Sequence, residues 1–433
     1  MLVVLVCLIL LASVAAAAPE LIVDIDFNDE VFIRKEPITE EQVEQLVRDL
    51  HAHGTETLIL RCGYLGYLPY QTDLSYPIGF DEEHARKGPN NGATVGADID
   101  AWIARRIEWN EVYRKVIEDF NPPEVFIRVG HELGMKVIMW IDLFDDGYPG
   151  YHSKFLTENP HCQWTGKDGT LFEGVTSYAW PEARAFRVAQ ATELLALGAD
   201  GIHCSTSCHP RHKPNVQEVD FYGYEQPIVD AYMSRYGVDI RTAEEFNERA
   251  WQVIKGEAMV QLYRELAEVC HGQGKELWVG MQLGDYTTLS SDPHFSDNAV
   301  CRYANDWRTL VDEGIADAMI VGDYELCSAP GNAYWRGKPD IRLREGEDLF
   351  AWAAREYADY CEDKTRLHIF SEWLPGSTQA LDARMAQWAS RVLANGFDGI
   401  DVHEAMNFES QGGMEVLRRF RQRLDGEDLG VLE

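Results

Sequence analysis

The sequence is poor in basic residues. Its 433 residues contain 39 Lys and Arg against 72 Asp and Glu, which gives a formal net charge of −33. Proteins bind nucleic acid by neutralising phosphates with Lys and Arg, so this deficit argues against a nucleic-acid partner. Hydrophobic residues, by contrast, make up 45% of the chain and aromatic residues 11%, which excludes a disordered chain. We therefore expect a folded and strongly acidic protein.

Long hydrophobic runs are absent after the first segment of the chain, residues 1–18, which reads MLVVLVCLILLASVAAAA. This segment is typical of an export signal cleaved near Ala18, although no Lys or Arg precedes its apolar stretch. Because its length is also close to the shortest span that crosses a bilayer, an uncleaved anchor stays open. We predict an exported protein, periplasmic or extracellular, with no stable membrane span after cleavage. The eight cysteines beyond Cys7 permit disulfides there but do not indicate their pairing.

Several catalytic signatures are also missing. No glycine-rich phosphate turn follows the first hydrophobic run of the mature chain, whose continuation reads DIDFNDEVFIRK. A Walker loop and a Gly-x-Ser-x-Gly elbow are absent too. These absences argue against nucleotide binding and against a serine hydrolase. They also disfavour an open doubly wound sheet, which is the main alternative to the fold predicted below.

A repeated pattern is present instead: a helix-like segment ends in glycine, and a short hydrophobic run follows within a few residues. Glycine provides the left-handed cap that ends a helix, and runs that are apolar on both faces are typical of strands in parallel sheets. The pattern occurs around Gly54, Gly134, Gly198, Gly274 and Gly396, and a sixth time after Gly314.

With residues 21–27 and 366–373 added, the hydrophobic runs number eight, each followed by helical sequence. Strict alternation of eight strands with helices predicts a (β/α)8 TIM barrel with mixed α/β composition. The expected strands begin near residues 21, 57, 136, 200, 276, 317, 366 and 398. The clearest helices cover residues 38–53, 181–197, 243–272, 348–362 and 380–395.

No linker or composition break separates a second domain, so residues 19–433 are expected to form a single barrel domain. Long segments rich in aromatic residues, Pro, Gly and His follow the strand ends at residues 63–102, 143–181, 205–241 and 284–300. In a TIM barrel the loops after the strands build the active site. We therefore look for function among polar residues at the ends of the strands.

The strand ends are rich in acids, interleaved with aromatic residues and His. Carboxylates transfer protons and stabilise charge, and aromatic faces cover sugar rings, so this mixture is typical of a carbohydrate site. The predicted catalytic residues are Glu372, Asp323, Glu404 and Glu325. The predicted substrate-binding residues are Asp26, Arg61, Trp140, Asp142, His203, Asp285, Tyr324, Trp373 and His403.

A simpler role is open for each of these acids, because acids also close helix N-termini and pair with Arg at a barrel rim. Asp24 and Asp401 are the weakest functional candidates. Glu372 is the strongest, because it follows the apolar run LHIF and precedes Trp373 and a Pro-Gly turn.

Short segments carry a family resemblance. GMKVIMWIDLF, the following SKFLTENPHCQW, and the later ADGIHCS and FDGIDVHE resemble the family-ten-like glycosyl hydrolases, secreted barrel proteins of a larger glycoside hydrolase superfamily. That family combines G-x-K-V-x-x-W in strand three with a loop S-x-F-L-x-x-x-P and a D-G-I in strand four. The resemblance covers most of the barrel in order but is specific only in these pieces. It implies a (β/α)8 fold and action on a glycan.

The sequence departs from this family at the end of strand four. Family members follow D-G-I with an acid, whereas Asp200, Gly201 and Ile202 are followed here by His203 and Cys204. A mechanism that takes an acid from strand four is therefore in doubt. By resemblance to retaining barrel glycosidases, Glu372 on strand seven is the nucleophile, and Asp323, Glu325 or Glu404 is its partner acid.

A competing cluster follows strand four. Cys204, Cys208, His209 and His212 form C-x3-C-H-x2-H, and such clusters can bind zinc. Oxidation of the cysteines in an exported protein, and the usual spread of catalytic zinc ligands over several strands, favour a disulfide or two buried thiols instead.

We predict an exported glycoside hydrolase that acts on a poly- or oligosaccharide, without a cofactor or a metal. The alternatives are a barrel that binds glycan without cleaving it, motivated by the missing strand-four acid, and a metal-dependent hydrolase that uses the His/Cys loop. The oligomeric state is not indicated by the sequence.

Overall fold

The computed structural model describes residues 18–32, 34, 36–87, 98–206, 222–281, 303–322, 344–372, 377–405, 408 and 412–432. Eight parallel strands close into a barrel in the order β1-β12-β11-β10-β9-β8-β3-β2. They are β1 (Glu20–Ile25), β2 (Thr57–Arg61), β3 (Lys136–Asp142), β8 (Gly201–Ser205), β9 (Glu276–Met281), β10 (Ala318–Val321), β11 (Arg366–Glu372) and β12 (Gly399–His403). Each strand begins within one residue of its predicted start, so the TIM barrel is confirmed.

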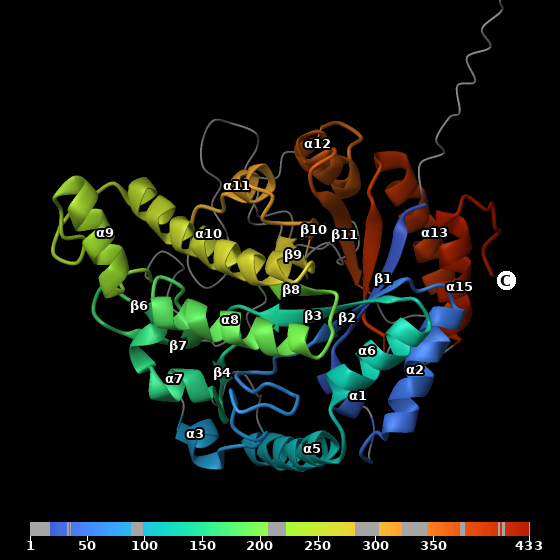
Figure 1. Ribbon diagram of the computed structural model, residues 1–433, viewed down its shortest axis with the longest axis horizontal. Helices are drawn as coiled ribbons and strands as arrows, with labels where there is room; N and C mark the ends of the chain where they lie inside the picture. The colour runs from blue at the N-terminus through green and yellow to red at the C-terminus, as the bar shows by residue number, and fades with distance from the viewer. Residues whose placement is uncertain are drawn as a thin grey trace, which may run out of the picture.

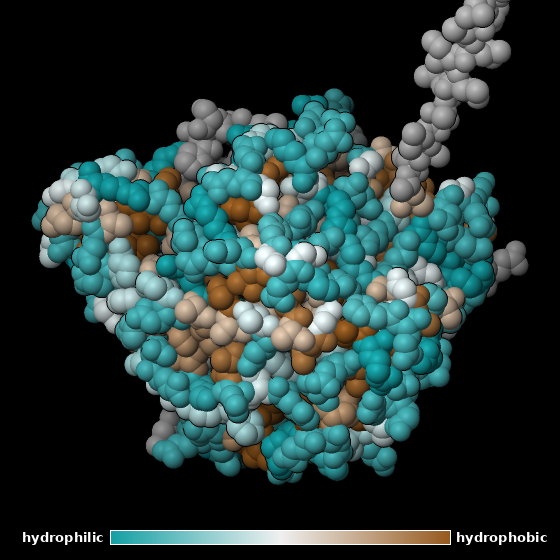
Figure 2. Space-filling view, in the orientation of Figure 1, coloured by the Kyte–Doolittle hydropathy of each residue, from teal (hydrophilic) through white to brown (hydrophobic). Residues whose placement is uncertain are grey.

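Helices surround the barrel, with α2 beside α6, α8 beside α10 and α13 beside α15 (Figure 1). The helices of the described part are α1 (Phe27–Phe32), α2 (Glu40–Ala52), α3 (Glu82–Lys87), α5 (Ile99–Asp119), α6 (Pro122–Glu132), α7 (Lys154–Glu158), α8 (Pro181–Ala196), α9 (Gln226–Tyr236), α10 (Glu248–Gly272), α11 (Trp307–Asp312), α12 (Leu349–Cys361), α13 (Thr378–Asn395) and α15 (Gly413–Leu424). Their outer faces are largely hydrophilic, and hydrophobic residues lie in the furrows between them on the face seen in Figure 2. None of these helices is both long and apolar enough to cross a bilayer.

The segments expected as loops contain more regular structure than predicted. Residues 143–181 form two small antiparallel sheets, β4 (Gly147–Tyr148) with β5 (Tyr151–His152) and β6 (Gln163–Thr165) with β7 (Leu171–Thr176). Helix α9 lies in the segment 205–241 although it contains a proline. That proline occupies the first turn, where a missing N–H costs no helical hydrogen bond, and Gly237 ends the helix with φ 69°.

The barrel interior is filled by alternate residues of the strands. A cluster of buried side chains occupies it: Ile22, Ile59, Ile138, Trp140, Trp278, Ala318, Ile320 and Phe370. Successive side chains on a strand point to opposite faces, so positions two residues further along the same strands also point inward. This alternation places polar residues of several strands at the mouth of the barrel, next to the buried hydrophobic cluster.

The repeated D-G-I sequence has a structural role at the opposite end of the barrel. The Asp200 carboxylate accepts a hydrogen bond from the backbone N–H of Val137 at 3.0 Å, and Asp398 accepts one from Leu367 at 2.7 Å. A side chain at Gly399 would place its Cβ 2.6 Å from Nδ1 of His368. The acid therefore fixes the start of the neighbouring strand, and the glycine leaves room for close strand packing.

Candidate active site

Seven predicted site residues have side chains that the structure describes, and all seven are buried at the C-terminal mouth of the barrel. They are Asp26, Arg61, Trp140, Asp142, His203, His403 and Glu404. Asp285, Asp323, Tyr324, Glu325 and Trp373 lie outside the described residues. The backbone of Glu372 ends β11 and pairs in register with His403, which places Glu372 at the same mouth.

Arg61, the last residue of β2, holds three carboxylates in place. It donates to Asp26 at 2.5 Å, to Asp142 at 2.8 Å and to Asp145 at 3.0 Å, and it is only 3% exposed. Asp142 also accepts a hydrogen bond from the Trp140 indole at 2.9 Å. Burial opposes ionisation of Asp26, but the Arg61 guanidinium outweighs it and lowers the pKa of Asp26. Asp26 is therefore ionised at neutral pH.

A second polar group joins β1 to the end of β12. Nδ1 of His403 lies 2.6 Å from a carboxylate oxygen of Asp24, and Nε2 of His403 lies 3.5 Å from a carboxylate oxygen of Glu404. Burial alone would lower the pKa of His403, but the Asp24 and Glu404 carboxylates raise it to about 10. Asp24, ranked low on sequence alone, is thus in direct contact with a predicted site residue.

Glu404, the residue after β12, is a further buried acid at the mouth. It is 7% exposed, and its Oε2 is buried without a hydrogen-bond partner among the described residues. Burial raises its pKa to about 9, although His403 favours the ionised form. At neutral pH Glu404 is therefore a neutral carboxylic acid that carries a proton.

The side chains of His203 and Cys204 in β8 are uncharged, in keeping with the absence of an acid after D-G-I in the sequence. His203 is 3% exposed, and burial lowers its pKa to about 3, so its imidazole is uncharged. Its ring meets Trp140 edge to face, with 6.1 Å between ring centroids. Cys204, the next residue, is a buried free thiol whose pKa burial raises. Cys208, His209 and His212 of the proposed zinc cluster lie outside the described residues.

A hollow of about 230 Å³ opens beside Asp26 and Arg61. Its other lining residues come from α1, the β2–α3 loop, α5 and β4: Asn28, Asp29, Phe32, Tyr64, Leu65, Arg106, Trp109 and Tyr148. Phe32 stacks on Trp109 with 5.0 Å between ring centroids and 26° between planes. The hollow combines carboxylates with aromatic surface, which is the combination expected of a sugar site.

Sequence reasoning missed most of this hollow. Asp145 lies in the segment 143–181, which is expected to be a loop, and Arg106 and Trp109 lie in α5, a helix that is not among those predicted from the sequence. Nothing in their local pattern links these residues to the strand ends. The signal that was available is the clustering of aromatic residues in residues 63–102 and 143–181.

Two groups of side chains in the described part have the composition of a metal site. In one, oxygens of Asp26, Asp29 and Glu404 lie within 4.8 Å of one another. Asp26 already accepts hydrogen bonds from Arg61 and Asn28, and burial raises the pKa of Glu404 to about 9. The other group joins His161, Cys162 and Glu182, away from the strand ends, and burial raises the pKa of its thiol to about 12.

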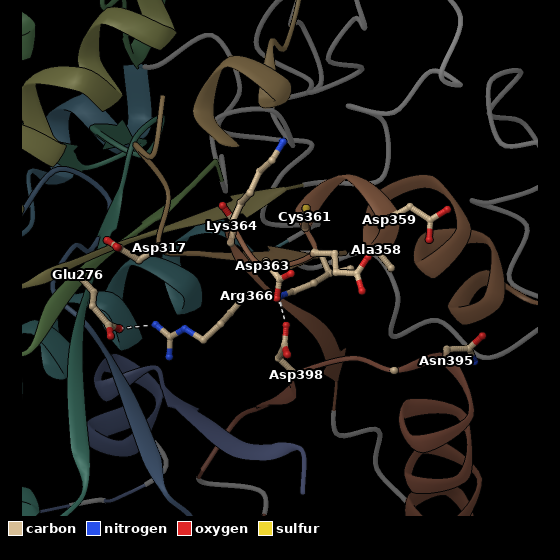
Figure 3. A pocket seen from close by; sticks show the side chains of 14 residues that line it. Glu276, Asp317, Ala358, Asp359, Cys361, Asp363, Lys364, Arg366, Asn395 and Asp398 are labelled. Carbon is tan, nitrogen blue, oxygen red and sulfur yellow. Dashed lines mark hydrogen bonds and ion pairs between the residues drawn. The ribbon is translucent and has the colours of Figure 1, made fainter. Parts of the chain in front are cut away.

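A larger hollow, about 710 Å³, lies at the opposite end of the barrel (Figure 3). Some of its charged side chains secure the starts of the strands: Arg366 donates to Glu276 at 2.6 Å, and Asp398 accepts from the backbone of Leu367. Polar networks at this end of a TIM barrel serve stability, whereas active sites lie at the C-terminal ends of the strands. We therefore place the candidate active site in the smaller hollow and the adjoining mouth.

No protein-family model and no curated protein sequence matches the chain. Among solved structures it is similar to the glycoside hydrolase domain of PgaB (BpsB) from Bordetella bronchiseptica, with a TM-score of 0.52 and 13% identity over 93% of this chain and 99% of that one. It is also similar to the catalytic domain of a β-amylase from Paenibacillus polymyxa, with a TM-score of 0.49 and 11% identity over 93% of this chain and 97% of that one. At these identities the likeness to PgaB shows a shared barrel fold and nothing finer.

Proposed function

We propose that this protein hydrolyses glycosidic bonds of a poly- or oligosaccharide at the C-terminal mouth of its barrel. One observation carries the proposal: an oxygen of Glu404, which is protonated at neutral pH, lies within 4.8 Å of an oxygen of ionised Asp26. Glycosidases need such a pair, in which one carboxyl group donates a proton and the other carries negative charge. The aromatic hollow beside the pair gives a sugar ring a place to bind.

Glu404 is the proton donor to the oxygen of the leaving sugar in this proposal. The ionised partner is Asp26 or Glu372, whose backbone lies in register with His403 next to Glu404. The carboxyl groups of retaining enzymes lie roughly 5–5.5 Å apart, and those of inverting enzymes lie roughly 6.5–9.5 Å apart to leave room for a water. One oxygen of Asp26 and one of Glu404 lie within 4.8 Å of each other, so we propose retention of configuration when Asp26 is the partner.

Other features support the same class of enzyme without testing it. The barrel fold is shared with solved glycoside hydrolases, and the short motifs resemble the family-ten-like glycosyl hydrolases. We propose that residues 1–18 direct export and that residues 19–433 are the catalytic domain. Asp323 and Glu325, predicted from the sequence as possible partner acids of Glu372, stay alternative candidates for that role.

The proposal is tested by the release of reducing ends from a panel of polysaccharides, with wild-type protein and with Glu404→Gln, Asp26→Asn and Glu372→Gln. Loss of the proton donor should lower kcat by about 10²–10⁴-fold on natural linkages, and far less on aryl glycosides whose leaving group needs no proton. Loss of the ionised partner should lower kcat on both kinds of substrate, since its charge is needed in the transition state itself. Glu111→Gln, which changes an exposed acid on α5, is the matched control.

The two candidate partners are separated by the same assay. Near wild-type turnover in Glu372→Gln would leave Asp26 as the ionised partner. Near wild-type turnover in Asp26→Asn would assign that role to Glu372. Binding of glycans without release of reducing ends would favour a non-catalytic carbohydrate-binding barrel. Loss of activity with chelators, together with stoichiometric zinc, would favour a metal-dependent hydrolase instead.

A further inference from the structure

Two arginines line the hollow, and their surroundings differ. Arg61 pairs with three carboxylates, each within 3.0 Å. Arg106, from α5, pairs with no carboxylate among the described residues. A cation that is partly removed from water is costly unless an anion compensates it. Arg61 is compensated by these carboxylates, whereas no carboxylate of the described residues pairs with Arg106.

The contacts of Arg106 are made by neutral groups. Its Nη1 donates to the hydroxyl of Tyr64 at 2.6 Å and lies 3.5 Å from that of Tyr151, while its Nε is buried without a hydrogen-bond partner in the described part of the chain. Burial keeps the Tyr64 hydroxyl neutral by raising its pKa. The guanidinium also lies 5.4 Å from the centroid of the Trp109 ring. These contacts fix the guanidinium in position, and none of them brings a carboxylate of the described ranges to its charge.

The size and walls of the hollow suit one sugar residue. Its volume of about 230 Å³ is below the roughly 300–1,000 Å³ of pockets that enclose drug-sized ligands. Helices α1 and α5 lie side by side at this edge of the molecule (Figure 1), and Phe32 of α1 stacks on Trp109 of α5 there. Aromatic faces contact the C–H surface of sugar rings, while Asp26 and Asp29 in the same hollow can accept hydrogen bonds from hydroxyl groups.

We propose that this hollow is a subsite for an acidic sugar residue, with Arg106 bound to the carboxylate of a uronic acid. A guanidinium matches a planar carboxylate with two parallel hydrogen bonds, which distinguishes it from the hydroxymethyl group of a neutral sugar. The inference rests on the proposed function, since it assumes a glycan substrate, and it narrows the substrate class to glycans that contain uronic acid.

Binding of monosaccharides tests the inference separately from hydrolysis, because these ligands contain no bond to cleave. The probes are D-glucuronate and D-galacturonate, their neutral methyl esters, D-glucose, D-galactose and acetate, measured by isothermal titration calorimetry. We expect at least one uronate to bind ten times more tightly than its ester. Arg106→Gln should erase this preference, Arg106→Lys should keep part of it, and Arg105→Gln, an exposed neighbour on α5, should leave it unchanged.

Three results would overturn the inference: equal affinity for the acid and its ester, no binding of either uronate, or acetate binding as tight as uronate binding. Should Arg106→Gln fail to fold by circular dichroism, the preference of wild type and of Arg106→Lys for the acid still decides the matter. Hydrolysis of neutral glycans without uronate binding would overturn the acidic subsite and leave the proposed function intact. Binding of uronates without hydrolysis of any glycan would support the subsite and contradict the hydrolase.

Discussion

Replacing Glu404 by Gln should stabilise the fold at neutral pH while it removes the proposed proton donor. In the unfolded chain this carboxyl has its ordinary pKa of 4.5, whereas in the fold burial raises the pKa to about 9. When folding raises the pKa of an acid, its protonated form favours the folded state, and this contribution to the free energy of unfolding is complete at pH values below the unfolded pKa. That contribution is lost as pH rises toward the folded pKa. Gln has no proton to lose, so the variant avoids this dependence.

The size of the effect follows from the interval between the two pKa values. Each pH unit above 4.5 destabilises the wild type by about 1.4 kcal/mol relative to the variant. At pH 7 the variant should therefore be more stable by about 3 kcal/mol. This is an upper figure, because the side chain of Glu404 is 10% exposed.

Urea unfolding at several pH values between about 5 and 8 measures the difference. The gap between Glu404→Gln and wild type should widen with pH, whereas Glu111→Gln on the surface of α5 should give a gap that does not change. A constant gap for Glu404→Gln would mean that Glu404 is ionised in the fold. Glu404 would then be excluded as the proton donor.

Three further predictions concern stability. Gly399→Ala should destabilise the barrel by about 1–3 kcal/mol in denaturant unfolding, since its Cβ would lie 2.6 Å from Nδ1 of His368. The control Gly272→Ala, with no heavy atom within 4 Å, should be neutral or slightly stabilising. Asp24→Asn should move the pKa of His403 from about 10 toward its ordinary 6.5, as followed by NMR titration. The raised pKa of His403 contributes stability that is complete below pH 6.5 and lost as pH rises through about 10, so this part of the pH dependence of stability should shrink in the variant. Finally, most of the 72 acids must be solvated, so added NaCl should screen their repulsion, and a melting temperature that falls steadily from low to moderate salt would contradict this.

The barrel could be predicted because its signals are local. Each strand is a short hydrophobic run, and a glycine that ends the preceding helix marks where the run begins, as at Gly134 before β3 and Gly396 before β12. Strict alternation of such units leaves few topologies for a closed core. The same locality explains the error in α9, where a proline was taken as a sign of a loop although it occupies a helix start.

The D-G-I sequence shows how a local motif can be recognised while its role depends on the fold. It contributed to the family resemblance, and in the structure it secures strand packing at the N-terminal end of the barrel, far from the candidate site. Asp398 contacts the backbone of Leu367 there, and Gly399 makes room beside His368. A motif of this kind indicates a barrel without indicating a reaction.

The ionisation of the site was decided by tertiary structure alone. Asp24 and His403 are 379 residues apart in sequence and 2.6 Å apart in the closed barrel, because β12 pairs with β1. The positions of the strand ends in the sequence predicted which acids reach the mouth. They did not predict that Arg61 keeps Asp26 ionised or that burial keeps Glu404 protonated. A pKa depends on desolvation and on charges within a few ångströms, and neither exists until the barrel closes. Composition and periodicity therefore determined the architecture and the residues at its mouth, whereas their charges and the partners of Arg61 and Arg106 came only from the packed chain.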